Sequence, residues 1–372
     1  MNPRVLIIVA VCAVVAVCAY FFTSSDVGAT LGRGQSEKPA TGTLQAQPSS
    51  GATTKPAKKT GKADWNFLTN LDAGKVRPAP TQEDIARFLA KHGETPANLI
   101  AAFEAAHDRR WLDRALELFP NSPLVLMKAV DAADNRSVPK EGEAYQANKE
   151  RLALIERFKA ADPNNPVPWI LAAQELFKSK QTDEGVAEIR AALERPAFYI
   201  YANERMDAAQ RLSESLGVGQ LEASASAMFG LTLPHMSAAT QASRGLMEWQ
   251  KSAAESGDTA SSSEALRLTY ELGHTFATPE ASRMLIGQLV GIAMEKRALE
   301  ALPAGSQPDW LMVTPVERLA EIEQKRANVR EVAKGIESVI QSQDGELIAE
   351  YLRRMRNESE AAAYDWLKRQ KK

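Results

Sequence analysis

The residues best suited to hold a metal or transfer a proton are few and widely separated in this sequence. None of the four histidines has a second ligand at metal-binding spacing. They are His92, His107, His235 and His274. Both cysteines, Cys12 and Cys18, lie in an apolar N-terminal run, so the rest of the chain has no thiol for a disulfide, a metal or catalysis. We expect no metal site and no cofactor, and we predict that each histidine is a surface or helix-end residue.

Motifs of the common hydrolases and nucleotide enzymes are also missing. The sequence has no phosphate-binding glycine loop, no nucleophile-elbow serine and no zinc-binding helix motif. Ser137 and Lys140 have the Ser-x-x-Lys spacing of penicillin-recognising enzymes, and a Lys-Thr-Gly segment at 59–61 resembles its partner motif. The two motifs stand in reversed order, and Pro139 disrupts the helix that the serine needs. We therefore do not interpret them as a catalytic site.

One class of enzyme needs only a glutamate on a helix, and the composition is compatible with it. Glu214-Ser215 and Glu358-Ser359 resemble the start of the catalytic signature of lytic transglycosylases, all-α enzymes of the bacterial envelope. Neither pair is followed by the Gly-Leu-Met-Gln-like segment that forms the sugar site of that family. A working acid also needs a pocket that raises its pKa. This enzyme is the alternative to a non-catalytic function.

The elements that must position any site are helices, and two repeated turns organise them. The segments 119–123 and 162–166 carry the same Pro-Asn-x-Pro spacing, with both prolines offset by 43 residues. In each segment the first proline ends a helix, because its ring clashes with the preceding turn. Ser122 or Asn165 then caps the next helix, and the second proline takes the first helical position. Such short turns predict stacked helical hairpins.

The segment after the second turn resembles the tetratricopeptide repeat. The matching residues are Trp169, Ala172, Ala173 and Leu176 on the first helix, and Gly185, Ile189, Ala192 and Pro196 on the second. The resemblance covers about a quarter of the chain and is divergent, since Ala172 replaces a larger aliphatic residue and Pro196 comes one residue early. It implies a surface for a protein partner, with first helices lining the concave face. The contact candidates on that face are Lys128, Asp131, Gln174, Glu175 and Lys178.

The remaining body also has helical periodicity. We expect helices from Thr81 to Gly93, over 202–216, 220–229, 237–255, 263–276 and 279–302, and from Thr314 to about Gln341. A last helix should follow Gly345 and carry Leu347, Tyr351, Leu352, Met355 and Trp366 on one stripe. Gly287 and Gly291 lie one turn apart and admit a close helix neighbour. The fold class is therefore all-α, an irregular helical-hairpin (tetratricopeptide-like) array.

The N-terminal part predicts a membrane anchor followed by a tether. Residues 5–22 are uncharged and almost wholly apolar, about 27 Å long as a helix, which just spans a bilayer core. A cleaved signal segment is the alternative, since small residues at 17–19 and 27–29 have suitable spacing. Positive charge before the segment and Asp26 after it favour a body outside the membrane. Residues 23–63 have no aromatic residue and read as a disordered linker.

The charge balance argues against nucleic acid as a ligand. Residues 1–63 hold seven Lys and Arg against two acidic residues, so the net charge of −2 for the whole chain leaves −7 for residues 64–372. We divide the chain into a transmembrane anchor or signal segment (1–22), a linker (23–63), a tetratricopeptide-like region (64–197) and a C-terminal helical region (198–372). The expected function is a membrane-tethered, periplasmic-side scaffold or adaptor for another envelope protein, secreted if the signal is cleaved.

Overall fold

Helices form all the regular structure in the residues that the computed structural model describes, so the predicted all-α class is confirmed for them. These residues are 79–134, 147–195, 198–277, 284–303, 305–342 and 344–370. The first helices are α3 (Gln82–His92), α4 (Pro96–Ala106), α5 (Arg109–Leu118), α6 (Pro123–Asp134), α7 (Lys149–Ala161), α8 (Val167–Lys178) and α9 (Thr182–Leu193). They continue with α10 (Ala202–Ser215), α11 (Gln220–Phe229), α12 (Pro234–Ser256), α13 (Thr259–Phe276), α14 (Leu285–Glu300), α15 (Pro315–Ser342), α16 (Gly345–Asn357) and α17 (Glu360–Gln370).

The helix starts follow the predicted capping chemistry. Thr81 and Asp84 form a capping box at α3, in which each side chain accepts the backbone N–H of the other residue. Thr314 and Glu317 make the same exchange at α15. Gly93 ends α3 with a φ of 83°, which a residue with a Cβ rarely adopts. Local sequence therefore fixes these helix ends.

Both repeated turns join helices as predicted. Helix α5 ends just before Phe119 and α6 begins at Pro123. In the second turn Asn165 Oδ1 accepts the N–H of Val167 at 3.1 Å, while Pro166 already has helical φ and ψ angles. The N-cap of α8 is therefore Pro166 and the first helical residue is Val167, one position later than the sequence predicted, although Asn165 still caps an N–H of the first turn.

The predicted last helix is wrong, because the chain breaks it into two. Helix α16 ends at Asn357, and Glu358 has non-helical angles of φ −111° and ψ −83°. The hydroxyl of Ser359 then accepts the N–H of Ala362 at 3.0 Å and begins α17. The break folds α17 back onto α15 and α16, so Trp366 does not continue the stripe of α16.

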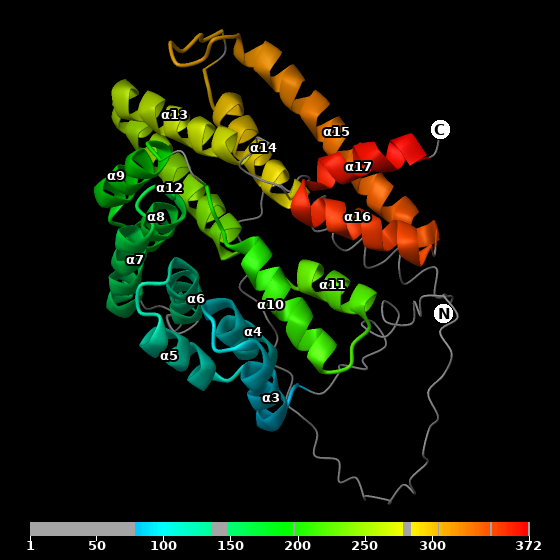
Figure 1. Ribbon diagram of the computed structural model, residues 1–372. Helices are drawn as coiled ribbons and strands as arrows, with labels where there is room; N and C mark the ends of the chain where they lie inside the picture. Colours follow the sequence, from blue (N-terminus) through cyan, green and yellow to red (C-terminus); the bar gives the residue numbers. More distant parts are fainter. Residues whose placement is uncertain are drawn as a thin grey trace, which may run out of the picture. The chain divides into compact units, whose positions relative to one another are not determined.

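The helices on either side of residue 197 share one core. Helix α4 packs against α10, α8 against α12 and α9 against α13 (Figure 1). A single cluster of buried apolar side chains extends from Ile85 in α3 to Met294 in α14. Residues from Lys75 onward therefore form one compact unit.

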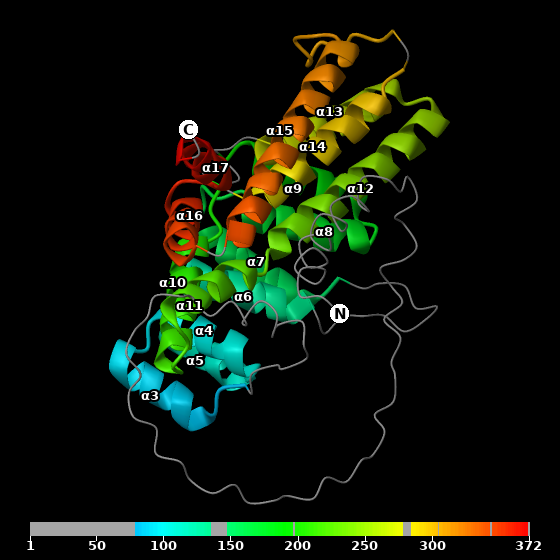
Figure 2. The same cartoon turned by 90° about the vertical axis from the view of Figure 1, so that its right-hand side faces the viewer.

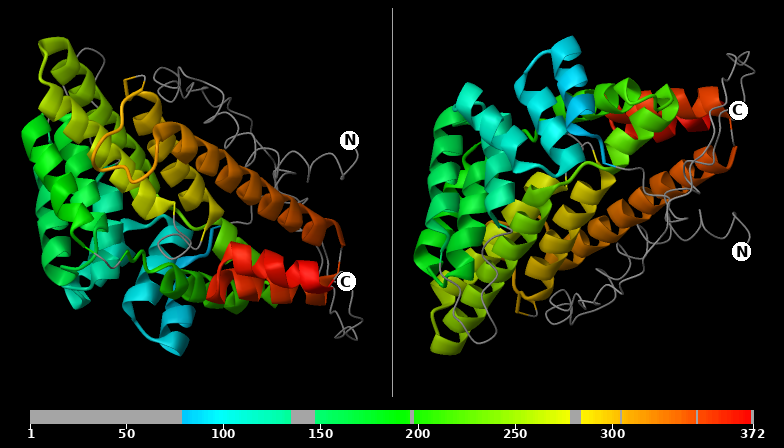
Figure 3. Two further views of the ribbon diagram at one scale, coloured as in Figure 1. Left: turned by 90° about the horizontal axis from the view of Figure 1, so that it is seen from above. Right: turned by 90° about the horizontal axis from the view of Figure 1, so that it is seen from below.

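Helices α12, α13 and α14 run side by side (Figure 2), and glycines allow α13 and α14 to approach closely. A Cβ on Gly291 of α14 would lie 2.4 Å from the carbonyl oxygen of Gly273 on α13. The prediction that Gly291 admits a close helix is thus confirmed, with Gly273 as its counterpart. Helices α16 and α17 complete the unit, α16 against α11 and α17 against α15 (Figure 3).

Several predicted features lie outside the described residues. These are the membrane segment, the linker, the short apolar segment 65–71 and the Ser137–Lys140 pair. Among the described helices, none has the length and apolar character that crossing a bilayer requires.

Candidate functional site

Three of the five residues predicted to contact a partner are buried: Lys128, Gln174 and Glu175. Gln174 and Glu175 on α8 are 2% and 0% exposed. Glu175 accepts hydrogen bonds from Arg151 Nη1 at 2.6 Å and from the N–H of Asn148 at 2.7 Å. Gln174 Oε1 accepts from Arg151 Nη2 at 2.9 Å. These side chains therefore fasten α7 to α8 and present no surface to a partner.

Lys128 and Asp131 belong to a second network. Lys128 Nζ lies 2.8 Å from Asp131 and 3.0 Å from Glu104, which in turn lies 2.6 Å from Arg205 Nη2. Burial opposes the charge of Glu104, but Arg205 and Lys128 together hold its pKa below the ordinary value. The network joins α4, α6 and α10. Asp131 and Lys178 are half-buried, and for them a contact role stays a prediction.

The packing around α8 explains this outcome. Helix α8 contacts α7, α9 and α12, and every residue from Val167 to Glu175 is buried. The resemblance to tetratricopeptide repeats placed this helix along an open concave face. Helices α7, α9 and α12 instead surround α8. The contact with the long α12 was not predicted from the sequence.

The two glutamates of the enzyme alternative are both exposed. Glu358 lies 3.0 Å from Arg354, and Glu214 accepts a hydrogen bond from Gln210 at 2.9 Å. A glycosidase acid needs a buried setting that favours its protonated form. Neither glutamate has one, and no observation favours this enzyme.

The histidines are mostly where the sequence predicted. His92 ends α3, His107 follows α4, and His274 lies near the end of α13. His235 is a helix-end residue too, the second of α12, but it is 1% exposed and not on the surface. Within the described part of the chain, no group of His, Cys, Asp or Glu has the geometry to hold a metal ion.

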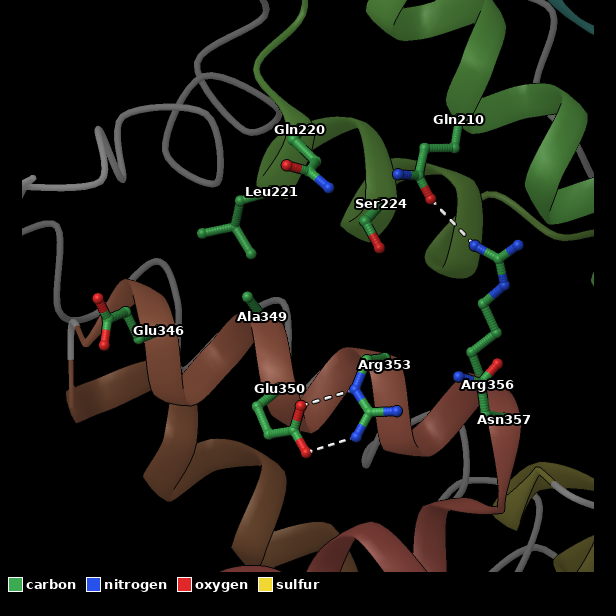
Figure 4. Close-up of a pocket in the computed structure, with 10 residues that line it drawn as sticks. All are labelled: Gln210, Gln220, Leu221, Ser224, Glu346, Ala349, Glu350, Arg353, Arg356 and Asn357. Atoms are coloured by element: carbon green, nitrogen blue, oxygen red, sulfur yellow. Dashed lines mark hydrogen bonds and ion pairs between the residues drawn. The ribbon is translucent and has the colours of Figure 1, made fainter. Parts of the chain in front are cut away.

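A groove with a volume of about 650 Å³ lies between α16 and the pair α10–α11 (Figure 4). Ten residues line it: Gln210, Gln220, Leu221, Ser224, Glu346, Ala349, Glu350, Arg353, Arg356 and Asn357. Leu221 and Ala349 form apolar patches on opposite walls, and the other side chains surround them. We call this opening the α11–α16 groove.

Three of the four charged side chains that line the groove form ion pairs. Arg353 donates two hydrogen bonds of 2.6 Å to the carboxylate of Glu350, and this lowers the pKa of Glu350 to about 2. Arg356 pairs with Asp207 and donates to Gln210 Oε1 at 3.0 Å. Glu350 is therefore an anion at neutral pH and is unsuited to act as a general acid.

Three uncharged polar side chains in the groove remain available to a ligand. Those of Gln220, Ser224 and Asn357 make no hydrogen bond to any other described residue. A carboxamide offers both donors and an acceptor, and a hydroxyl offers one donor and two acceptor positions. The groove therefore offers apolar contact together with free hydrogen-bond donors and acceptors. Its lining residues do not include a nucleophile paired with a general base.

Compared with protein-family models, curated proteins and solved structures, the chain matches none of them.

The groove was not found from the sequence, although part of its signal was present. The segment 220–229, predicted as a helix, is rich in alanine and serine, and such small residues let a neighbouring helix approach closely. That packing occurs with α10, where Ala223 and Ala225 are buried. Another face of α11, with Gln220, Leu221 and Ser224, lines the groove opposite α16, and only the fold brings these helices, about 125 positions apart in the chain, together.

Proposed function

We propose that the protein is a non-catalytic adaptor that binds an extended segment of another envelope protein in the α11–α16 groove. One observation carries the proposal: free amide and hydroxyl groups stand beside apolar Leu221 and Ala349 in an open groove. An extended main chain presents alternating N–H and C=O groups that carboxamides can match. A side chain of the bound segment would cover the apolar patches.

The α8–α9 hairpin supports a tetratricopeptide-like origin for the scaffold. Trp169, Ala172 and Ala173 are buried, and so are Ile189 and Ala192. A Cβ on Gly185 would lie 3.0 Å from the ring of Phe177, so the small residue permits close packing of the two helices. In this family such hairpins form binding scaffolds, which agrees with an adaptor.

The sequence of residues 5–22 supports a membrane tether, with the body on the periplasmic side of the membrane. The tether would hold the groove near partners in the same compartment. A tethered site needs less intrinsic affinity, because the linker raises the effective concentration of the partner.

Site-specific photo-crosslinking tests the proposal. A benzophenone amino acid replaces Leu221 in the full-length chain in its membrane, and the control variant carries it at Ala90, an exposed residue of α3. We expect light to attach one defined polypeptide to the probe at 221 and none at 90. The substitution Ala349→Trp should abolish the adduct, since Ala349 is exposed and the indole fills the groove without disturbing the core.

The proposal fails if the probe at 221 yields no polypeptide adduct, or if the adduct persists in the Ala349→Trp variant with the fold intact by circular dichroism. Adducts of equal yield at 221 and 90 would indicate collisions and would also contradict it. The matched substitution Ala90→Trp should leave the adduct at 221 unchanged.

A further inference from the structure

A second cavity, of about 280 Å³, lies where the ends of several helices converge. Its walls come from the starts of α10, α12 and α17, the ends of α11 and α16, and the residue before α14. Arg356 lines both this cavity and the α11–α16 groove. We call it the methionine cavity, because five of its lining residues are Met206, Met228, Met236, Met284 and Met355.

The methionines give the cavity an apolar and adaptable lining. The protein has 10 methionines, and half of them lie here. Thioether side chains are unbranched and polarisable, so they adjust to apolar ligands of different shape. Phe198 adds an aromatic wall and contacts the ring of His235 edge-on at 5.5 Å between centroids. The lining therefore favours a ligand with an apolar body.

Glu360 places a carboxyl group in the cavity lining without an ion-pair partner among the described residues. Its Oε2 accepts the N–H of Leu285 at 2.6 Å and so occupies the N-terminus of α14. It forms no ion pair with any described residue, whereas the buried Glu175 and Glu295 each lie within 3.0 Å of an arginine. Arg356 does not compensate it, because Arg356 pairs with Asp207. Burial raises the pKa of Glu360 to about 7.

His235 provides a second polar group without a partner. It is 1% exposed, lines the cavity, and its buried Nε2 makes no hydrogen bond with the described residues. Burial, and then the charge of Arg205, lowers its pKa to about 3, so the ring is neutral. A buried ring nitrogen normally has a partner. A neutral imidazole can accept a hydrogen bond from a ligand N–H.

We propose that the methionine cavity binds a small apolar molecule that carries one primary ammonium group, with the ammonium paired to Glu360 and the apolar body against the methionines. A ligand carboxylate would place two like charges together, and a neutral ligand would leave Glu360 uncompensated. The volume lies near the lower limit for small-molecule sites, about 300–1,000 Å³, so the ligand is small. The inference does not rest on the groove or on the proposed adaptor function.

Three six-carbon probes test this assignment on the purified full-length chain by calorimetry at pH 8. Hexylamine should bind at least tenfold more tightly than hexanol or hexanoate. Glu360→Gln should weaken hexylamine at least tenfold, since glutamine keeps the acceptor for Leu285 but not the charge. Glu83→Gln, at an exposed glutamate outside both the cavity and the groove, should leave the affinity unchanged.

The pH dependence adds an independent readout. Hexylamine should bind at least tenfold more tightly at pH 8 than at pH 5, because Glu360 gains its charge across this range while the amine, like lysine, keeps its own. The groups near Glu360 are Tyr351 and Arg356 of α16 and His235 of α12, and none of them changes charge between these values.

Equal affinity for hexylamine and hexanol would overturn the proposal, as would the absence of binding by all three probes. Retention of hexylamine affinity in Glu360→Gln would also overturn it. The probe comparison uses the unmodified chain, so it decides the matter even if the variant fails to fold.

Discussion

Glu175, which is fully buried, and Glu360, which is half-buried, have opposite surroundings. Glu175 on α8 lies between Arg151 and the N–H of Asn148, and the carboxylate charge is matched inside the fold. Glu360 at the start of α17 has only the N–H of Leu285 and no cation among the described residues. The first arrangement belongs to a closed structural core, and the second to the wall of a cavity.

The difference teaches how to separate structural charges from functional ones. A buried pair satisfies itself, so its loss is felt in stability. A half-buried charge without a partner also costs free energy, and proteins retain such groups where a ligand or reaction uses them. By this criterion the predicted contacts Gln174 and Glu175 are structural, and Glu360 marks a site.

Glu175→Gln should have the largest effect, a loss of about 3–5 kcal/mol in the free energy of unfolding, because it leaves Arg151 buried and charged. Urea denaturation followed by circular dichroism at pH 7 measures it. Glu117→Gln is the matched control: it also removes an arginine-paired carboxylate, but an exposed one, and should cause no measurable change. A loss below about 1 kcal/mol for Glu175→Gln would contradict the interpretation of Glu175 as a structural charge.

Glu360→Gln should increase the free energy of unfolding at high pH, whereas Glu175→Gln decreases it. The folded-state pKa of about 7 lies above the ordinary 4.5, so this group favours folding below pH 4.5 and loses that contribution as pH rises through 7. The free energy of unfolding of the variant should therefore be higher than that of the parent protein by up to about 3 kcal/mol at pH 8, and equal to it at pH 4. Urea midpoints at both pH values measure the change. A variant less stable than the parent protein at pH 8 would contradict the interpretation.

His235→Phe should have the smallest effect on the free energy of unfolding, and this effect should occur only at acidic pH. The folded-state pKa of about 3 lies below the ordinary 6.5, so the neutral ring contributes stability above pH 6.5 that is lost as pH falls toward 3. At pH 5 this loss amounts to about 2 kcal/mol, and the phenylalanine variant should not show it. Unfolding at pH 7 and pH 5 measures the difference. His107→Asn serves as control, because His107 is exposed and asparagine tolerates its left-handed backbone; an identical pH response in His235→Phe and the parent protein would refute the prediction.

Local signals predicted most of the helices correctly. The capping pairs at Thr81 and Thr314 and the prolines of the repeated turns determine helix ends through contacts within three or four residues. The break at Glu358 was missed because α16 and α17 are each helical by periodicity, and Ser359 is a weak stop in sequence alone. Gln174 and Glu175 present no surface to a partner because α8 packs against α7, α9 and α12, and local sequence does not reveal that long-range packing.

The sequence by itself determined that the described residues are helical, where most helices start and end, and that Gly291 admits a close neighbour, since these depend on backbone conformation and residue size. The α11–α16 groove and the methionine cavity were decided only by the tertiary structure. Their walls come from helices far apart in the chain. The packing of these helices also decides whether an arginine lies beside Glu175 or Glu360. Burial and charge pairing depend on this packing, and no local sequence pattern encodes them.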